Sequence, residues 1–183
     1  MPRSQSDLSN TAIRIFLQDV GNFYDHARGF EVFTPTAKQK QLVYAYFDGC
    51  CAYCGTLLDG DLATLDHLIP LNKKALGLHA WGNVVASCRH CNKEKHFKDW
   101  LEFLRVKAGD RWELRRERIL AFVAHYSYSP ELGLHTIAEN LYQDVGEVGM
   151  TLVRLRLRQA QESISAIVRP RSGPRSGTFD KPS

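Results

Sequence analysis

Four cysteines in two matched pairs are the residues of this chain best suited to bind a metal ion. Two residues separate Cys51 from Cys54, and two separate Cys88 from Cys91. Each pair can present two thiolates on one side of a tight turn, and two pairs complete the tetrahedral sulfur shell of a structural zinc site. We therefore predict one structural zinc ion per chain, held by these four cysteines.

Two neighbouring residues offer alternatives within this site. Cys50 could replace Cys51 only if the first pair were one residue longer, so we assign Cys51 and expect Cys50 to be a small buried residue. His90 lies inside the second pair, but four thiolates already fill the shell. Because four of the five cysteines have metal-ligand spacing, a reducing compartment is favoured over disulfide bonding. A redox protein is disfavoured, because no thioredoxin-like βαβ pattern surrounds the pairs.

The segment between the two pairs carries side chains that can do chemistry. Between Cys54 and Cys88 lie 33 residues, more than the ~15–20 of a simple zinc ribbon. They include the dipeptide Asp66-His67, followed by Leu68-Ile69-Pro70 and a polar loop, and Asn92 directly follows the last cysteine. This arrangement indicates a reactive site that a structural ion holds in place.

The order of these motifs resembles the HNH endonuclease family. In its four-cysteine form the family pattern runs Cys-x-x-Cys, Asp-His-Ile-x-Pro, Asn, and Cys-x-x-Cys-(Asn or His)-x-x-Lys. The corresponding residues are Cys51, Cys54, Asp66-His67-Leu68-Ile69-Pro70, Asn83, Cys88, Cys91-Asn92 and Lys95. Phe33-Thr34-Pro35, before a helix rich in Lys and Gln, is also similar to family members. The resemblance covers residues 33–104, about two fifths of the chain.

The resemblance implies a role for each matched polar residue. His67 would be the general base that deprotonates a water for attack on a phosphodiester, a step to which a neutral imidazole is suited. Asp66 and Asn92 would bind one Mg²⁺ or Mn²⁺ ion through oxygen atoms, and the ion would stabilise the leaving oxygen. Asn83 would hold the loop by hydrogen bonds and help to orient His67. The products would carry 5′-phosphate and 3′-hydroxyl groups.

Basic residues around the motif are candidates for contact with nucleic acid. Lys95 and Arg89, on the helix that holds the second pair, would contact phosphates. Lys73 and Lys74 lie in the loop after Pro70, where many relatives have a Ser and a Gly-Gly instead. This changed loop could therefore add phosphate contacts.

Each assignment has a simpler structural alternative. His67 could be a hydrogen-bonded core histidine, Asp66 a turn or cap residue, and Asn92 a helix cap. Lys95 and Arg89 could be solvated charges. A strand also directs adjacent side chains such as Asp66 and His67 to opposite sides, unless it bends at the site.

Outside the cysteine-bracketed segment the chain is predicted to be mostly helical. Apolar residues at helical spacing predict a helix over residues 9–26, capped by Ser9 or Asn10. Thr34-Pro35 begins a second helix that ends at Gly49. Further elements are predicted as strands at 62–69 and 83–87 and helices from 89, after 98, and over 112–129.

We therefore predict an α+β fold with a small ββα-metal core and a structural zinc, embedded in mostly helical N- and C-terminal extensions. The expected division is an N-terminal helix packing on the core (1–32), the HNH core (33–108), a helical C-terminal extension (109–168) and a basic tail (169–183). The tail is rich in Pro, Gly and Ser, a composition typical of disorder.

Apolar residues in steps of three or four predict one long helix over residues 133–166. Gly146 and Gly149 weaken this prediction locally. The apolar stripe either packs on its own domain or forms the seam of a homodimer. Arg154 and Arg158, one turn apart, could reach a nucleic acid backbone.

The net charge of +4 is unevenly distributed. Lys and Arg outnumber Asp and Glu within 89–118 and 151–183, whereas 119–150 contains no Lys or Arg. The two basic blocks favour a polyanion partner, although the first could consist of ordinary solvated helix faces. We expect a metal-dependent endonuclease of double-stranded DNA, in restriction, phage defence or a mobile element. The alternative is a noncatalytic zinc-stabilised module that binds nucleic acid or a protein.

No membrane association is expected. The chain has no apolar run of ~18 residues, and its first residues are polar rather than a basic and then apolar signal. With 183 residues and 44% hydrophobic content, it can bury a core of its own. These features predict a cytoplasmic protein.

Overall fold

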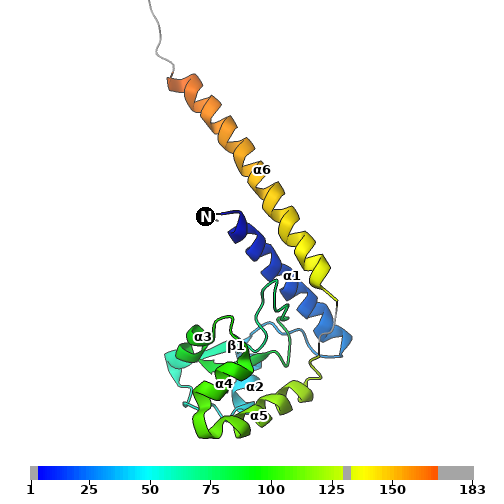
Figure 1. The fold of residues 1–183 in the computed structure, drawn as a ribbon, viewed down its shortest axis with the longest axis vertical. Coiled ribbons are helices and arrows are strands. Elements are labelled where there is room, and N and C mark those ends of the chain that lie inside the picture. Colours follow the sequence, from blue (N-terminus) through cyan, green and yellow to red (C-terminus); the bar gives the residue numbers. More distant parts are fainter. Residues whose placement is uncertain (1–3, 130–132, 169–183) are drawn as a thin grey trace, which may run out of the picture.

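Two long antiparallel helices project from a compact body that contains the two strands (Figure 1). The computed structural model describes residues 4–129 and 133–168, with side chains as far as residue 164. The long helices are α1 (Gln5–Ala27) and α6 (His135–Val168). The body contains α2 (Ala37–Tyr46), β1 (Ala63–His67), β2 (Val84–Cys88), α3 (Arg89–Lys95), α4 (Trp100–Ala108) and α5 (Trp112–His125), with 3₁₀ turns at Gly60–Leu62 and Gly109–Arg111. The predicted basic tail, 169–183, lies outside the described residues.

Strands β1 and β2 form a two-stranded antiparallel sheet, and α3 packs against it. The register pairs Ala63 with Cys88 and His67 with Val84, so His67 ends β1 and Cys88 ends β2. Helix α3 begins at the residue directly after β2, which places the second cysteine pair at the junction of strand and helix. The predicted α+β class, with a small ββα unit among helices, is confirmed.

Two predicted helix starts are shifted, because other residues provide the caps. Helix α1 begins at Gln5, and the Ser4 hydroxyl accepts a hydrogen bond from the Asp7 amide. Ser9, predicted as a cap, is instead buried within the helix. Helix α2 is capped by Thr36 rather than the predicted Thr34, and it ends at Tyr46 rather than Gly49. Ser and Thr recur near both starts, so composition did not distinguish the true caps.

The contact between α1 and α6 depends on small residues. The Ser9 hydroxyl donates a hydrogen bond of 2.6 Å to the Tyr142 carbonyl. A Cβ atom at Gly146 would lie 2.8 Å from the Ser9 hydroxyl oxygen, and one at Gly149 would lie 3.0 Å from a methyl carbon of Leu8. Gly146 therefore allows the two helices to approach each other closely, whereas at Gly149 only the end of the Leu8 side chain would have to move.

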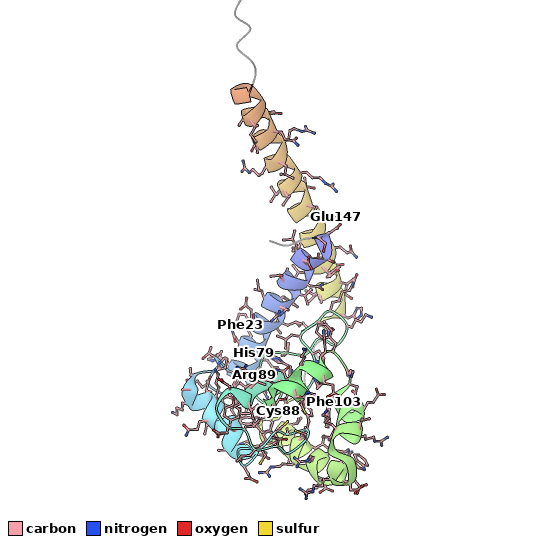
Figure 2. All side chains as sticks on the ribbon, turned by 90° about the vertical axis from the view of Figure 1, so that its left-hand side faces the viewer. Phe23, His79, Cys88, Arg89, Phe103 and Glu147 are labelled. Carbon is pink, nitrogen blue, oxygen red and sulfur yellow. The ribbon has the colours of Figure 1, made fainter. Side chains whose placement is uncertain are left out.

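Beyond this contact, α6 continues past the start of α1 (Figure 1). Figure 2 shows side chains projecting around this distal part of α6, beyond the position of Glu147. The exposed large apolar side chains there are Leu152, Val153, Leu155, Leu157 and Ile164. The apolar stripe thus packs on the chain's own domain only along the first half of α6. Among the described residues, no helix has both the length and the apolar character needed to cross a membrane.

Helix α1 also packs against the long loop between the strands. Ile13 and Leu17 of α1 form a small core with Leu78 and Ala80 of the loop. The His79 amide donates a long hydrogen bond of 3.5 Å to the Leu17 carbonyl. Gly21 is buried at this contact, where a Cβ atom would overlap the His79 carbonyl oxygen. The loop is therefore held from outside the strand hairpin.

We predict that Gly21→Ala lowers the free energy of unfolding by about 1–3 kcal/mol, because the new methyl group meets backbone that cannot move aside. Gly149→Ala is the matched control within a helix. Its methyl group meets only the mobile end of Leu8, and the gain in helix propensity makes it neutral or stabilising by up to about 1 kcal/mol. Urea unfolding of both variants measures the difference, and equal stability would contradict the prediction.

Candidate active site and zinc site

The four paired cysteines form one cluster. Their sulfur atoms all lie within 4.8 Å of one another, and the sulfurs of Cys54 and Cys88 are 3.8 Å apart. Tetrahedral zinc with Zn–S bonds of ~2.3 Å requires sulfur atoms about 3.8 Å apart. A hydrogen bond from the Cys91 thiol lowers the pKa of Cys51 to about 4, and the same contact raises the pKa of Cys91. The donor set and its spacing therefore fit zinc.

The two alternative ligands lie elsewhere. The Cys50 thiol donates to the Asp48 carbonyl at 3.5 Å, and this cysteine is half-buried rather than buried as expected. The His90 ring nitrogen Nε2 lies 3.1 Å from a carboxylate oxygen of Glu94. Among the described residues, the metal-binding group contains only the four paired cysteines, and all five cysteines are free of disulfide bonds.

His67 lies at the end of β1 with one ring nitrogen engaged. Its Nε2 lies 2.9 Å from Nδ1 of His79, which comes from the long loop. Burial is the main cause that lowers the pKa of His67 to about 3, and charges at His79, Lys95 and Arg14 lower it further. The imidazole is therefore uncharged near neutral pH, and its Nδ1 atom is not used in the contact with His79.

Asp66 is buried in an ion pair. Its Oδ2 atom accepts a hydrogen bond of 2.7 Å from the Tyr53 hydroxyl and lies 3.1 Å from Nζ of Lys95. Lys95 also donates to the His67 carbonyl at 2.7 Å. Burial raises the pKa of Asp66, while Lys95 and Tyr53 oppose this shift. The carboxylate is held in one orientation and keeps lone pairs that a cation could use.

Asn92 lies on the first turn of α3, beside the end of β1. Its amide nitrogen donates to the Leu65 carbonyl at 2.9 Å, which fixes the side chain against the strand. The amide oxygen is not used in this bond. Asn92 can therefore present an oxygen ligand to a hard cation.

Asp66, His67 and Asn92 line one cleft of about 390 Å³. The two adjacent strand residues thus reach the same space, in spite of the alternation expected of a strand. Oxygen atoms from Asp66 and Asn92 would hold a divalent ion there. The other lining residues are Arg14, Pro70, Leu71, Lys93, His96 and Phe97.

Asn83 lies apart from this cleft and closes the loop. It is fully buried, accepts a hydrogen bond of 2.8 Å from the Ile69 amide, and donates to the carbonyls of Ile69 and Leu78 at 3.0 and 2.7 Å. The loop is thereby tied together directly after β1. These contacts are those expected of a residue that supports the loop.

The basic residues expected at the phosphates are not those that line the cleft. Lys95 is fully buried beneath Asp66, so the expected phosphate contact does not fit its position. Lys73 lies 3.3 Å from a Glu139 carboxylate oxygen and 4.0 Å from the Tyr142 ring centre, so it attaches the loop to α6. Lys74 and Arg89 are exposed and do not line the cleft.

No sequence motif indicated Lys93 and Arg14, which line the cleft, or His79, which contacts His67 without lining it. Lys93 follows Asn92 and is exposed, so its proximity to the motif was the one available signal. His79 lies in the segment between the two cysteine pairs, but its spacing to His67 matches no known sequence motif. Arg14 is far from the motif in sequence and reaches the cleft only through the packing of α1.

We predict about one tightly bound zinc ion per chain, as the four-thiolate shell requires. Cys88→Ser should abolish zinc binding and cause loss of folding, because binding and folding are coupled in such sites. Cys50→Ser is the matched control and should retain the zinc, since its sulfur lies outside the cluster. Elemental analysis and circular dichroism of both variants test this, and a folded, zinc-free wild-type protein would contradict it.

The family comparison agrees with this geometry. Residues 51–98 match the family model described as HNH endonuclease, and no curated protein matches the chain. The matched segment runs from Cys51 through the sheet to just past the end of α3, and α1, α2, α4, α5 and α6 lie outside it. This segment, with its ββα arrangement and four-cysteine cluster, is similar to an HNH domain.

Proposed function

We propose that the protein is a metal-dependent endonuclease that hydrolyses phosphodiester bonds of double-stranded DNA. The supporting observation is the meeting of Asp66, His67 and Asn92 in one cleft beside the cysteine cluster. An HNH domain supports a nuclease or another function on nucleic acid in general. The cleft supports hydrolysis, because it brings a neutral imidazole and two oxygen donors together.

In this mechanism His67 removes a proton from water. Nδ1 can accept the proton only if Nε2 carries the ring hydrogen, so His79 accepts the Nε2–H hydrogen bond at its Nδ1 atom. The contact fixes both the tautomer and the ring orientation of His67. Asp66 and Asn92 would hold a divalent ion, which would supply positive charge for the leaving oxygen. Lys95 and Tyr53 keep the Asp66 carboxylate in place.

The alternative function is a noncatalytic zinc-stabilised module that binds nucleic acid or a protein. Such a module needs the cysteine cluster and a basic surface, but it does not need a base and two oxygen donors in one cleft. Asp66, His67 and Asn92 are all present, and all three line the cleft. The endonuclease is therefore the function that the geometry favours.

Cleavage of supercoiled plasmid in Mg²⁺ or Mn²⁺ tests the proposal. We expect cleavage to stop when the divalent ion is omitted, and His67→Ala to lower the rate by at least about 100-fold, the usual contribution of a general base. His90→Ala is the control, because His90 is exposed on α3 and lies outside the cleft. Unchanged cleavage by His67→Ala would exclude His67 as the base. Absence of cleavage by the wild type would favour the binding module.

We also propose that two chains pair through α6. Apolar residues on the distal half are exposed, and Ile137 and Val148 extend this exposed surface toward the proximal half. The distal half carries Arg154, Arg156 and Arg158, whereas the charged groups of the proximal half are mainly Glu139, Asp144 and Glu147. In an antiparallel pair, the basic half of each helix lies beside the acidic half of its partner. A second copy of this chain is therefore complementary to the exposed surface.

Light scattering during size-exclusion chromatography measures the oligomeric state. We expect a dimer that Leu155→Asp converts to a monomer, because a charge would be buried in the apolar seam. Gln161→Asp is the control, since it places the same charge on another side of the distal helix. A wild-type monomer at micromolar concentration, or equal effects of the two variants, would contradict the pairing.

A further inference from the structure

One wall of the cleft comes from outside the HNH domain. Arg14 of α1 lines the cleft together with Asp66, His67 and Asn92, although it precedes the matched segment in sequence. The same helix packs against the loop that carries His79. Helix α1 therefore contacts the supporting loop and also supplies a charged residue to the cleft.

Arg14 has no competing partner on its own helix. Side chains three or four residues away are the ones within reach on a helix, and these are Asn10, Thr11, Leu17 and Gln18, none of which is acidic. Across the described part of the chain, Arg14 forms no ion pair or hydrogen bond. The guanidinium is exposed and remains available for an anion.

The position of Arg14 is nevertheless well defined. Ile13 and Leu17, one residue before it and three after it, are almost completely buried against the loop. Gly21, one turn further along, contacts the backbone of His79. The backbone that carries Arg14 is thus fixed relative to His67, and only the side chain needs to be ordered when a ligand binds.

Arg14 offers paired donors to a phosphate, which Lys93, the lysine that lines the cleft, does not provide. Lys95, the lysine of the family motif, is buried and paired with Asp66, so it cannot reach a phosphate in the cleft. A phosphodiester under attack gains negative charge, and a guanidinium can donate two parallel hydrogen bonds to its oxygens. Among the cleft residues, only Arg14 offers this planar pair of donors.

We propose that Arg14 binds the phosphate group that is being cut and stabilises the charge that develops on it, so that α1 is part of the active site. This inference rests on the proposed endonuclease function. It assigns to the N-terminal extension a catalytic residue that residues 51–98 lack, and it means that the HNH domain alone has an incomplete cleft.

Kinetics of plasmid cleavage at saturating Mg²⁺ test the inference in the full chain. We expect Arg14→Ala to lower kcat by about 100-fold, as removal of one preorganised donor to a transition state does. Arg14→Lys should recover part of the loss, because it restores the charge without the paired donors. The thermal unfolding temperature should not change, since the Arg14 side chain is exposed.

Lys38→Ala is the charge-matched control, because Lys38 is exposed on α2 and lies outside the cleft. It should leave kcat and KM unchanged. The inference is overturned if Arg14→Ala keeps kcat within about twofold of the wild type, if it raises KM alone, or if Lys38→Ala causes the same loss. Each of these results would mean that Arg14 contributes only to the general positive charge that attracts DNA, without a specific role at the phosphate being cut.

Binding of a short DNA duplex separates this inference from the proposed function. Fluorescence anisotropy would compare His67→Ala with the double variant His67→Ala/Arg14→Ala. We expect the double variant to bind about tenfold more weakly, with a salt dependence reduced by about one phosphate contact. If the wild type does not cut but this difference appears, the endonuclease proposal fails and Arg14 remains a phosphate ligand. If the wild type cuts but neither kcat nor binding depends on Arg14, only the present inference fails.

Discussion

The buried carboxylate of Asp66 is the point at which the zinc site and the cleft are joined. Its Tyr53 partner lies between the two cysteines of the first pair, and its Lys95 partner lies on the helix that carries Cys91. The cysteine cluster holds that turn and that helix together. Loss of the cluster would therefore remove both partners of Asp66 at once and leave a buried charge unpaired, which is strongly unfavourable.

A second set of contacts holds the loop after β1 and does not involve the cysteine cluster. Asn83 ties Ile69 to Leu78 through its side-chain amide, and helix α1 packs against the next residues of the loop. Between these two supports lies His79, the partner of His67. His67 is thus oriented by the loop, whereas its neighbour Asp66 is oriented by residues attached to the cysteine cluster. Two adjacent residues of one short strand depend on two different parts of the chain.

The features that could be predicted from the sequence are those determined by short spacing. The two cysteine pairs, the helix that starts at the second pair and the position of Asn92 on its first turn follow from residues less than about two turns apart. The strand pair was also predictable, because its apolar runs are bounded by turn residues. All of these features are determined by residues that lie close together in the sequence.

The features that could not be predicted depend on tertiary packing. The motif spacing suggested that Lys95 faces a phosphate, but the spacing does not show which side of α3 is covered by β1. Lys73 was predicted as a phosphate contact, and its partner Glu139 could not be anticipated because it lies on a helix 66 residues further along the chain. Arg14 and His79 had no motif at all, and only the docking of α1 on the loop brings them to His67.

The pairing of Asp66 with Lys95 also limits how a divalent ion can be held in the cleft. Asn92 is neutral and the charge of Asp66 is largely balanced by Lys95, so the protein offers little net negative charge to a cation. Magnesium sites in proteins commonly combine one or two carboxylates with phosphate oxygens of the substrate. In the proposed endonuclease, the substrate phosphate would therefore supply most of the negative charge, and residues that bind the phosphate would also affect how firmly the ion is held. Under the proposed function, Arg14 of α1 and the oxygen donors Asp66 of β1 and Asn92 of α3 would act on the same phosphate and ion.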